Sequence, residues 1–319
     1  MTEPEPDDET PSGAVTPSMT VADAAGVVVQ SCLSELIRAA KTFHRGQTPD
    51  HLHQTRVGLR RLRTAMKIFR PAIARQTWIH TLAELEWLAG ELNDARDLDV
   101  FVEDTFRPAR ADLSARKPAA LYAAKIKTAR AAAYIRASAA LESERFEKFV
   151  TETAAWLEAG VSVGIDDLGQ RALLAGPVVP FAGEVLDRLT RQVRKRGKHL
   201  ARLSAPHRHK LRIRAKRLRY AVEFFAHTFG AGGPKKRRVF GEALKALQAT
   251  LGHLNDLAQA GDQAQAVIGN SASKQLTFIA GELTGRAVAD EPHALKKAAA
   301  AFEDFEKARR FWPKSGVAN

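Results

Sequence analysis

Two segments of the sequence place histidine, arginine and lysine at the spacing of one helical face. The two sets are His53, Arg56, Arg60, Arg63 and Lys67 in the first segment, and His209, Arg212, Lys216 and Arg219 in the second. Cations three or four residues apart share a face of an α-helix, so each set predicts one cationic stripe. Arginine grips two oxygens of an anion with its planar fork, and lysine supplies a compact, mobile charge. The stripes are therefore suited to binding anions such as phosphates.

The second stripe belongs to the most basic part of the chain. The chain has 49 Lys and Arg residues against 36 Asp and Glu residues, which gives a net charge of +13. Fourteen of the cations and none of the acidic residues lie between Arg188 and Arg219, so the other 287 residues carry a net charge of −1. So dense a patch attracts anions and needs a counter-charge to relieve its self-repulsion. We expect a polyanionic ligand.

Local ion pairs do not neutralise the stripes. A solvated helix face usually interleaves its cations with carboxylates. No acidic residue stands three or four positions from any arginine of the first stripe, and only Glu223 stands so close to Arg219. Apolar residues such as Leu59, Leu62 and Met66 form a second stripe, which predicts the buried side of the same helix. The cations thus flank a core face and favour a functional role.

The rest of the pattern predicts an almost entirely α-helical chain. A content of 45% apolar and 27% charged residues is typical of a soluble protein with a packed core. Ala, Leu, Arg and Glu recur at helical spacing, and Gly and Pro stand mostly in short breaks. The expected helices span 19–45, 49–70, 75–105 with a break near Asn93 and Asp94, 117–158, 181–201, 205–229, 235–266, and 272–311 with a break near Glu291 and Pro292.

Glycine and proline gather between residues 160 and 180, which predicts a linker between a first half, 19–159, and a second half, 181–312. Residues 1–18 are acidic and rich in Pro, Ser and Thr, so we expect a disordered tail and no signal peptide. This tail could fold back on the cationic stripes as an internal competitor. No stretch is apolar enough for a membrane span, and the single cysteine, Cys32, excludes an intrachain disulfide. We expect a cytoplasmic protein.

The two halves repeat each other. Residues 53–63 align with residues 209–219 at a constant offset of 156, which pairs His53 with His209, the cations of the two stripes with each other, and Leu62 with Leu218. A second match places 90–94 on 252–256 at an offset of 162. The larger offset indicates a few additional residues in the loop that precedes this match in the second half. We interpret the chain as a duplicated helical unit.

These segments resemble a known family. His-x-x-Arg-Val-x-x-Arg-Arg-Leu-Arg from His53, His-x-x-Arg-Ile-x-x-Lys-Arg-Leu-Arg-Tyr from His209, and Leu-Asn-Asp-Ala-Arg-Asp-Leu-Asp-Val from Leu92 are similar to the CHAD domain, the conserved histidine α-helical domain. The resemblance covers residues from about 20 to 311. It implies two pseudo-symmetric four-helix bundles around a basic groove or pore. It also implies binding of inorganic polyphosphate, often at intracellular polyphosphate granules. The residues by themselves indicate only a duplicated helical protein that binds polyanions.

A polyphosphate chain offers phosphates and no base or sugar, so Arg and Lys suffice to bind it. The expected first contacts are Arg56, Arg60, Arg63, Arg212, Lys216 and Arg219. Residues that could extend the groove, or face solvent instead, are Lys67, Arg38 and its counterpart Arg194, Lys195 and Lys198; Tyr220 stands at the edge of the basic segment. Three roles stay open for His53 and His209: phosphate contact, hydrogen bonding near a helix start, or metal ligation. We expect neither metal nor cofactor.

Two arginines and an acidic run point to structural roles. Arg61 and Arg217 lie off the stripes, and we expect them to pair with carboxylates between Asp94 and Asp99 or with Asp256. The acidic run could instead bind Mg²⁺ for phosphoryl chemistry. A polyphosphate-cleaving enzyme of the triphosphate-tunnel class needs Glu-x-Glu-x-Lys on a strand, whereas the nearest match, Glu142–Phe146, has Phe in place of Lys within a helical pattern. No glycine-rich phosphate loop is present. We expect a binding protein and not an enzyme.

Nucleic acid is the main alternative ligand. The electrostatic attraction does not distinguish one phosphate chain from another, and a pair of basic helices could straddle a duplex. However, no aromatic residue between Arg188 and Arg219 could stack on bases, and the stripes lack Asn or Gln beside Arg for reading base pairs. An anionic membrane surface ranks last, because the apolar stripes have the pattern of a bundle core and not that of an interfacial helix.

Overall fold

The computed structural model describes residues 14–229, 234–269 and 273–313. Over these ranges the chain is helical and forms no strand, apart from an isolated bridge between Thr20 and Pro177, so the all-α prediction is confirmed. The helices are α1 (Val21–Arg45), α2 (Pro49–Ile68), η1 (Arg70–Ala72), α3 (Arg75–Val100), η2 (Phe101–Phe106), α4 (Arg107–Ala109), η3 (Arg110–Asp112), α5 (Arg116–Leu141), α6 (Glu144–Ala159), α7 (Leu168–Ala175), α8 (Val178–Gly197), η4 (Leu200–Arg202), α9 (Ala205–Phe224), α10 (Pro234–Ile268) and α11 (Lys274–Lys307).

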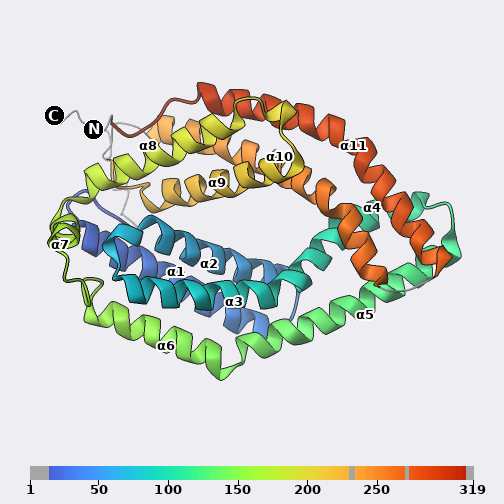
Figure 1. Cartoon of the computed structure of the whole chain (residues 1–319), viewed down its shortest axis with the longest axis horizontal. Coiled ribbons are helices and arrows are strands. Elements are labelled where there is room, and N and C mark those ends of the chain that lie inside the picture. Colours follow the sequence, from blue (N-terminus) through green and yellow to red (C-terminus); the bar gives the residue numbers. More distant parts are fainter. Residues whose placement is uncertain (1–13, 230–233, 270–272, 314–319) are drawn as a thin grey trace, which may run out of the picture.

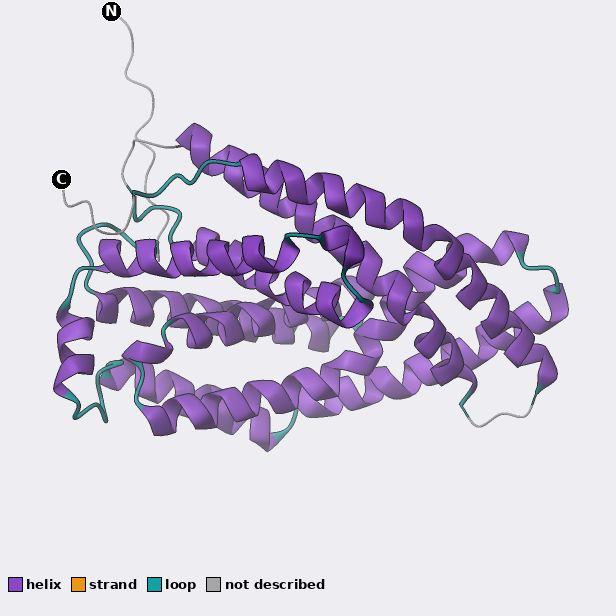
Figure 2. Cartoon of the chain, turned by 45° about the horizontal axis from the view of Figure 1, so that its top comes forward, coloured by secondary structure: helices purple, strands orange, loops and turns teal. Residues whose placement is uncertain are grey.

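The helices of the two halves lie on opposite sides of the molecule. Figure 1 shows α1, α2, α3 and α6 on one side and α8, α9, α10 and α11 on the other. Along each side successive helices pack together: α1 on α2 and α2 on α3, then α8 on α9, α9 on α10 and α10 on α11. Helices α2 and α9 contact each other across the middle. The long helix α5 runs from α3 to the far ends of α10 and α11 (Figures 1 and 2).

The two central helices, α2 and α9, begin and end at matching positions. Thr48 caps α2, because its hydroxyl accepts a hydrogen bond from the backbone N–H of His51 at 3.2 Å. The bounds of α9 are those of α2 moved by 156 residues, the offset of the sequence match. The apolar stripes of both segments are buried, as predicted. They comprise Leu59, Leu62, Met66 and Phe69, and Leu211, Ala215, Leu218, Val222 and Phe225.

Two hydrophobic cores hold the fold together. The larger core lies under α1, α2, α8, α9 and the first part of α3 and α10, and its centre contains a triplet of rings, Phe69, Phe181 and Phe225, with centroids 5.5–6.4 Å apart. The smaller core joins α5, α10 and α11 around the π-helical turn η2. There the hydroxyl of Tyr122 donates a hydrogen bond to the carbonyl of Ala264 at 2.8 Å, so the buried phenol is satisfied.

Three helix boundaries differ from the sequence prediction. The segment 117–158 is two helices, because Ser143 caps α6 by accepting a hydrogen bond from the backbone N–H of Phe146. No break occurs at Asn93 and Asp94: α3 continues to Val100 and leads into η2. Helix α11 runs through Pro292. Proline removes one backbone hydrogen bond there, and burial of apolar residues on both sides of it in α11 offsets that loss.

Some of the expected linker and tail is ordered. The segment 160–180 contains α7, capped by Asp167, and the start of α8. Residues 14–18 are packed against the fold: Val15 is 1% exposed, and its carbonyl accepts a hydrogen bond from the hydroxyl of Thr228. The acidic residues of the expected tail, up to residue 13, lie outside the described residues. In the part of the chain that is described, no helix is both long and apolar enough to cross a membrane.

Candidate anion-binding site

Helices α2 and α9 run side by side in the same direction, so that matched cations meet. The parallel register follows from neighbouring pairs along both helices: Arg60 lies near Lys216, and further along the rings of Phe69 and Phe225 are 6.0 Å apart. We call the four innermost cations the central cluster. These residues are Arg56 and Arg60 of α2 and Arg212 and Lys216 of α9. The structure therefore brings four of the six expected first contacts together.

The positive charges of the central cluster lower the pKa of Lys216. Burial, followed by the positive charges of Arg212 and Arg60, lowers the pKa of Lys216 from its usual value to about 7, although the carboxylate of Asp256 on α10 acts in the opposite direction. A lysine with this pKa is only partly protonated near neutral pH. An anion that entered the cluster would favour the protonated form.

Burial and nearby positive charges also lower the pKa values of Arg56 and His53. Burial and the charge of Arg60 lower the pKa of Arg56 to about 10, and Nη1 of Arg56 donates a hydrogen bond to the side-chain oxygen of Asn93 at 2.5 Å. Burial and the charge of Arg96 on α3 lower the pKa of His53 to about 4, so His53 is neutral near pH 7. The sequence analysis did not include Arg96 among the site residues. Its place in the Leu-Asn-Asp-Ala-Arg-Asp-Leu-Asp-Val motif that starts at Leu92 was the available signal.

The central cluster lacks sufficient counter-charge. Among the described residues, none of its four members forms an ion pair. Asp97 and Asp256 face it, and burial raises the pKa of both carboxyls. The Nε atoms of Arg56, Arg60 and Arg212 are buried and have no hydrogen-bond partner within the described part of the chain, and the same holds for Nε of Arg63, Arg194 and Arg208. The excess of cations over the two facing carboxylates is what suits the cluster to an anion.

The outer cations of each stripe are held by equivalent partners. Arg63 donates a hydrogen bond to Glu86 of α3 at 2.7 Å, and Arg219 donates one to Gln248 of α10 at 2.9 Å. Glu86 and Gln248 are related by 162 residues, the offset of the second sequence match. Arg219 also pairs with Glu223 at 2.5 Å. These contacts fix the orientation of α2 on α3 and of α9 on α10.

The two histidines have different surroundings. Nδ1 of His209 lies 2.5 Å from the side-chain oxygen of Asn255, so this histidine is hydrogen-bonded to α10. Nδ1 of His53 is buried and has no partner among the described residues. His53 is therefore the better placed of the two to contact a ligand. No group of His, Cys, Asp and Glu in the described ranges has an arrangement that could hold a metal ion.

The remaining expected residues are dispersed. Arg194 donates hydrogen bonds to the carbonyls of Glu306 and Ala308 at 3.2 and 3.0 Å, so it ties α8 to the end of α11. Tyr220 is 2% exposed, which corrects its assignment to the binding surface: its ring packs against Phe224 and is covered by the guanidinium groups of Arg61 and Arg219. The exposed members of the expected set are Arg38, Lys195 and Lys198, and Lys67 is half-buried at the end of the first stripe.

Arg61 is structural, but its predicted partners are wrong. It bridges Glu35 of α1 at 2.8 Å and Glu223 of α9 at 2.5 Å. Arg217 pairs with no carboxylate among the described residues; burial and nearby arginines lower its pKa. The carboxylates expected for them are used elsewhere. Asp94 pairs with Arg136, and Asp99 accepts hydrogen bonds from Arg130 and Tyr134.

Comparison with known proteins identifies the fold. The family profile described as the CHAD domain matches residues 27–265. The chain belongs to the CHAD domain family. Among solved structures, it is similar to the crystal structure of the CHAD domain from the plant Ricinus communis, with a TM-score of 0.76 and 26% identity over 94% of this chain and 96% of that one. It also shares its fold with PptA from Streptomyces chartreusis, with a TM-score of 0.68 and 17% identity over 89% and 100% of the two chains. No curated protein matches the sequence.

Proposed function

We propose that this CHAD domain protein binds inorganic polyphosphate through the central cluster. The observation that carries the proposal is the concentration of Arg56, Arg60, Arg212 and Lys216 at the junction of α2 and α9, half-buried and without an ion pair in the described ranges. Bound phosphates would supply the missing counter-charge. Polyphosphate binding is also consistent with membership of the CHAD family.

Inorganic polyphosphate fits this cluster better than nucleic acid does. Proteins that bind single-stranded nucleic acid place aromatic faces in a basic groove, where bases stack on them. The aromatic residue nearest to the second stripe, Tyr220, is buried in the core. The cluster offers guanidinium and ammonium groups, which suit a chain of phosphates without bases.

We further propose that the two halves are a duplicated unit around a basic groove, with the central cluster as its floor. Two observations support this arrangement: the matching bounds of α2 and α9, and the equivalent hydrogen bonds from Arg63 to Glu86 and from Arg219 to Gln248. A groove built on a pseudo-two-fold axis would present similar cations to a polyphosphate chain running in either direction, which suits a ligand without polarity.

We propose binding without catalysis, and an association with intracellular polyphosphate granules as its consequence. The acidic run that could have bound Mg²⁺ is engaged in structural contacts: Asp94 pairs with Arg136, and Asp99 with Arg130. Release of phosphate from polyphosphate by the purified protein would contradict this part of the proposal.

The test is competition binding at physiological salt. Labelled long-chain polyphosphate is displaced by unlabelled polyphosphate, single-stranded DNA or duplex DNA at equal phosphate concentration. We expect polyphosphate to displace the label at the lowest concentration. The variant Arg60→Gln/Lys216→Gln should lose at least about 100-fold in affinity, because each charge-assisted contact contributes about 1.5–3 kcal/mol.

A matched control removes two exposed cations from helices away from the cluster, in the variant Lys125→Gln/Lys296→Gln. We expect it to bind within about 3-fold of the wild type, since distant exposed charges are screened. Circular dichroism should give the same helicity for all three proteins. Equal displacement by DNA would make the protein a general polyanion binder, and an unchanged affinity of the cluster variant would refute the assignment of the site.

A further inference from the structure

A second group of cations lies between α2, α8 and α9, and Arg63, the next cation of the first stripe after Arg60, is close to two of its members. Lys67, Arg188 and Arg217 line a pocket of about 200 Å³ together with Gln192. Burial and neighbouring arginines lower the pKa of both Lys67 and Arg217. In the part of the chain that the structure describes, none of these three cations forms a hydrogen bond or an ion pair. Like the central cluster, the pocket has excess positive charge that the protein does not neutralise.

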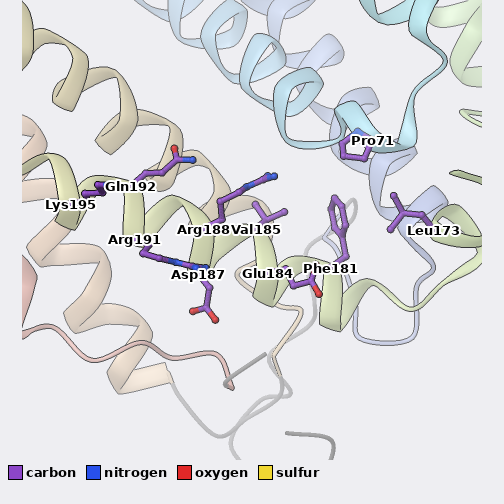
Figure 3. Close-up of a pocket in the computed structure, with 10 residues that line it drawn as sticks. All are labelled: Pro71, Leu173, Phe181, Glu184, Val185, Asp187, Arg188, Arg191, Gln192 and Lys195. Atoms are coloured by element: carbon purple, nitrogen blue, oxygen red, sulfur yellow. The ribbon is translucent and has the colours of Figure 1, made fainter. Parts of the chain in front are cut away.

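This pocket continues over the surface of α8. Arg188 and Gln192 also line a larger hollow of about 830 Å³, whose other cations are Arg191 and Lys195. Figure 3 shows these cations along α8, at the end of the hollow away from the apolar Pro71, Leu173 and Phe181. We call Arg188, Arg191 and Lys195 the α8 track. Their spacing of three and four residues places them in a row of roughly 10 Å on one face of the helix.

The acidic residues near the α8 track only partly offset it. Glu184 and Asp187 line the same hollow. Asp187 is already engaged with the C-terminal segment, because its carboxylate accepts hydrogen bonds from Nη1 of Arg310 at 3.3 Å and from Nε1 of Trp312 at 2.8 Å. Glu184 lies at the apolar end, beside Phe181 in Figure 3. The track therefore retains a net positive charge along its length.

The first half of the chain has no such track. Positions 156 residues before Arg188, Arg191 and Lys195 hold Cys32, Glu35 and Ala39. Cys32 is buried, and Glu35 pairs with Arg61. The residue that matches Lys67 in the second half is Glu223, which also pairs with Arg61. One side of the α2 and α9 pair is thus closed by an ion network, whereas on the opposite side Lys67, Arg188 and Arg217 form no ion pair with any described residue.

We infer that the α8 track is an extension of the binding site, which holds the distal phosphates of a long inorganic polyphosphate chain after it leaves the central cluster through the Lys67, Arg188 and Arg217 pocket. The inference rests on the proposed binding at the cluster. It adds that the chain leaves on the α8 side and not on the side closed by Arg61, and that affinity grows with chain length until the track is filled. A short ligand such as tripolyphosphate occupies the cluster alone.

The test compares two ligands on three proteins at physiological salt. The track variant is Arg188→Gln/Arg191→Gln/Lys195→Gln, and the control variant, with the same loss of three exposed cations, is Lys117→Gln/Lys125→Gln/Lys296→Gln. Isothermal titration calorimetry measures binding of long-chain polyphosphate and of tripolyphosphate to each. We expect the track variant to lose at least about 10-fold in affinity for the long chain and less than about 2-fold for tripolyphosphate. The control should lose less than about 3-fold for either ligand.

Two outcomes would overturn the inference: equal losses in the track and control variants, or equal losses for both ligands in the track variant. The substituted side chains are exposed, so all three proteins should keep their helicity, which circular dichroism checks. The variant Arg60→Gln/Lys216→Gln separates the two proposals. If it loses both ligands while the track variant behaves as the control does, the cluster binds polyphosphate and the track plays no part.

Discussion

Binding of polyphosphate should be coupled to uptake of a proton by Lys216. Burial and the charges of Arg212 and Arg60 lower the pKa of this lysine to about 7 in the free protein, with Arg56 adding to the effect and Asp256 opposing it. Phosphate groups in the cluster would supply negative charge and return the pKa toward its usual value of 10.5. Between these two values the complex holds a proton that the free protein lacks. Affinity should therefore fall as the pH rises through this window.

The size of the effect follows from the two pKa values. At pH 8 about 0.1 of the free protein has a protonated Lys216, and at pH 6 about 0.9 does. Each binding event should thus take up about 0.9 proton at pH 8 and about 0.1 proton at pH 6. Through this group alone, affinity should fall about 8-fold between pH 7.5 and pH 8.5.

Calorimetry in two buffers with different heats of ionisation measures the proton uptake directly. The variant Lys216→Gln should bind polyphosphate more weakly and take up almost no proton at pH 8. His53→Gln is the control for a second titrating group: because the pKa of His53 is about 4, this variant should keep the uptake at pH 8. Uptake below about 0.3 proton by the wild type at pH 8, or undiminished uptake by Lys216→Gln, would refute the reasoning.

The remaining predictions concern the stability of the ligand-free protein, measured by urea unfolding. Lys216→Gln should raise the free energy of unfolding at pH 6 by on the order of 2–4 kcal/mol, because the unfolded state binds a proton at Lys216 below pH 10.5 more tightly than the folded state does. At pH 10 the substitution should have little effect, and an equal effect at both pH values would contradict this prediction. Arg61→Met should lower the free energy of unfolding by about 1–3 kcal/mol, because two carboxylates lose their partner. Arg217→Met should lower it by less than about 0.5 kcal/mol, and equal losses would argue against the difference in ion pairing between Arg61 and Arg217. Gly58→Ala should cost about 1–3 kcal/mol, because its Cβ would lie 3.0 Å from Cα of Leu36, and an unchanged stability would show that α1 can move away from α2 at little cost.

The periodic features of the sequence predicted the helical fold and the position of the central cluster. Helical spacing indicated which faces of α2 and α9 are buried, and this succeeded because it depends on residues close together in the sequence. The offset of 156 residues placed Arg56 and Arg60 at positions equivalent to Arg212 and Lys216, in helices whose bounds match at the same offset. The break at Ser143 was missed for a related reason: Glu142 and Ser143 interrupt no hydrophobic period, and only the cap formed with Phe146 reveals them.

Long-range pairing could not be predicted in the same way. The sequence assigned Arg61 to the acidic run after Asp94, but the structure pairs it with Glu35 and Glu223, which lie 26 and 162 residues away. Which carboxylate an arginine meets depends on how helices cross, and spacing along one helix carries no information about that crossing. Tyr220 illustrates the same limit. It neighbours Arg219 in sequence, but a rotation of one residue around α9 carries it from the cationic stripe into the core.

The two sides of α2 and α9 differ in how their arginines are compensated, and in the proposed duplicated unit this difference would make one side the exit for the ligand. With lysine at both equivalent positions, 67 and 223, Arg61 and Arg217 would both face a like charge. Glutamate at position 223 and at position 35 stabilises Arg61 on one side. Lysine at position 67 and arginine at position 188 leave Arg217 uncompensated on the other. The protein therefore gains stability on the closed side, and on the open side it keeps the unpaired charge that a polyanion can neutralise. A single chain threaded along the open side would relieve repulsion at the cluster, at the pocket and at α8 together, which is why binding should strengthen with the length of the ligand and not merely with its charge.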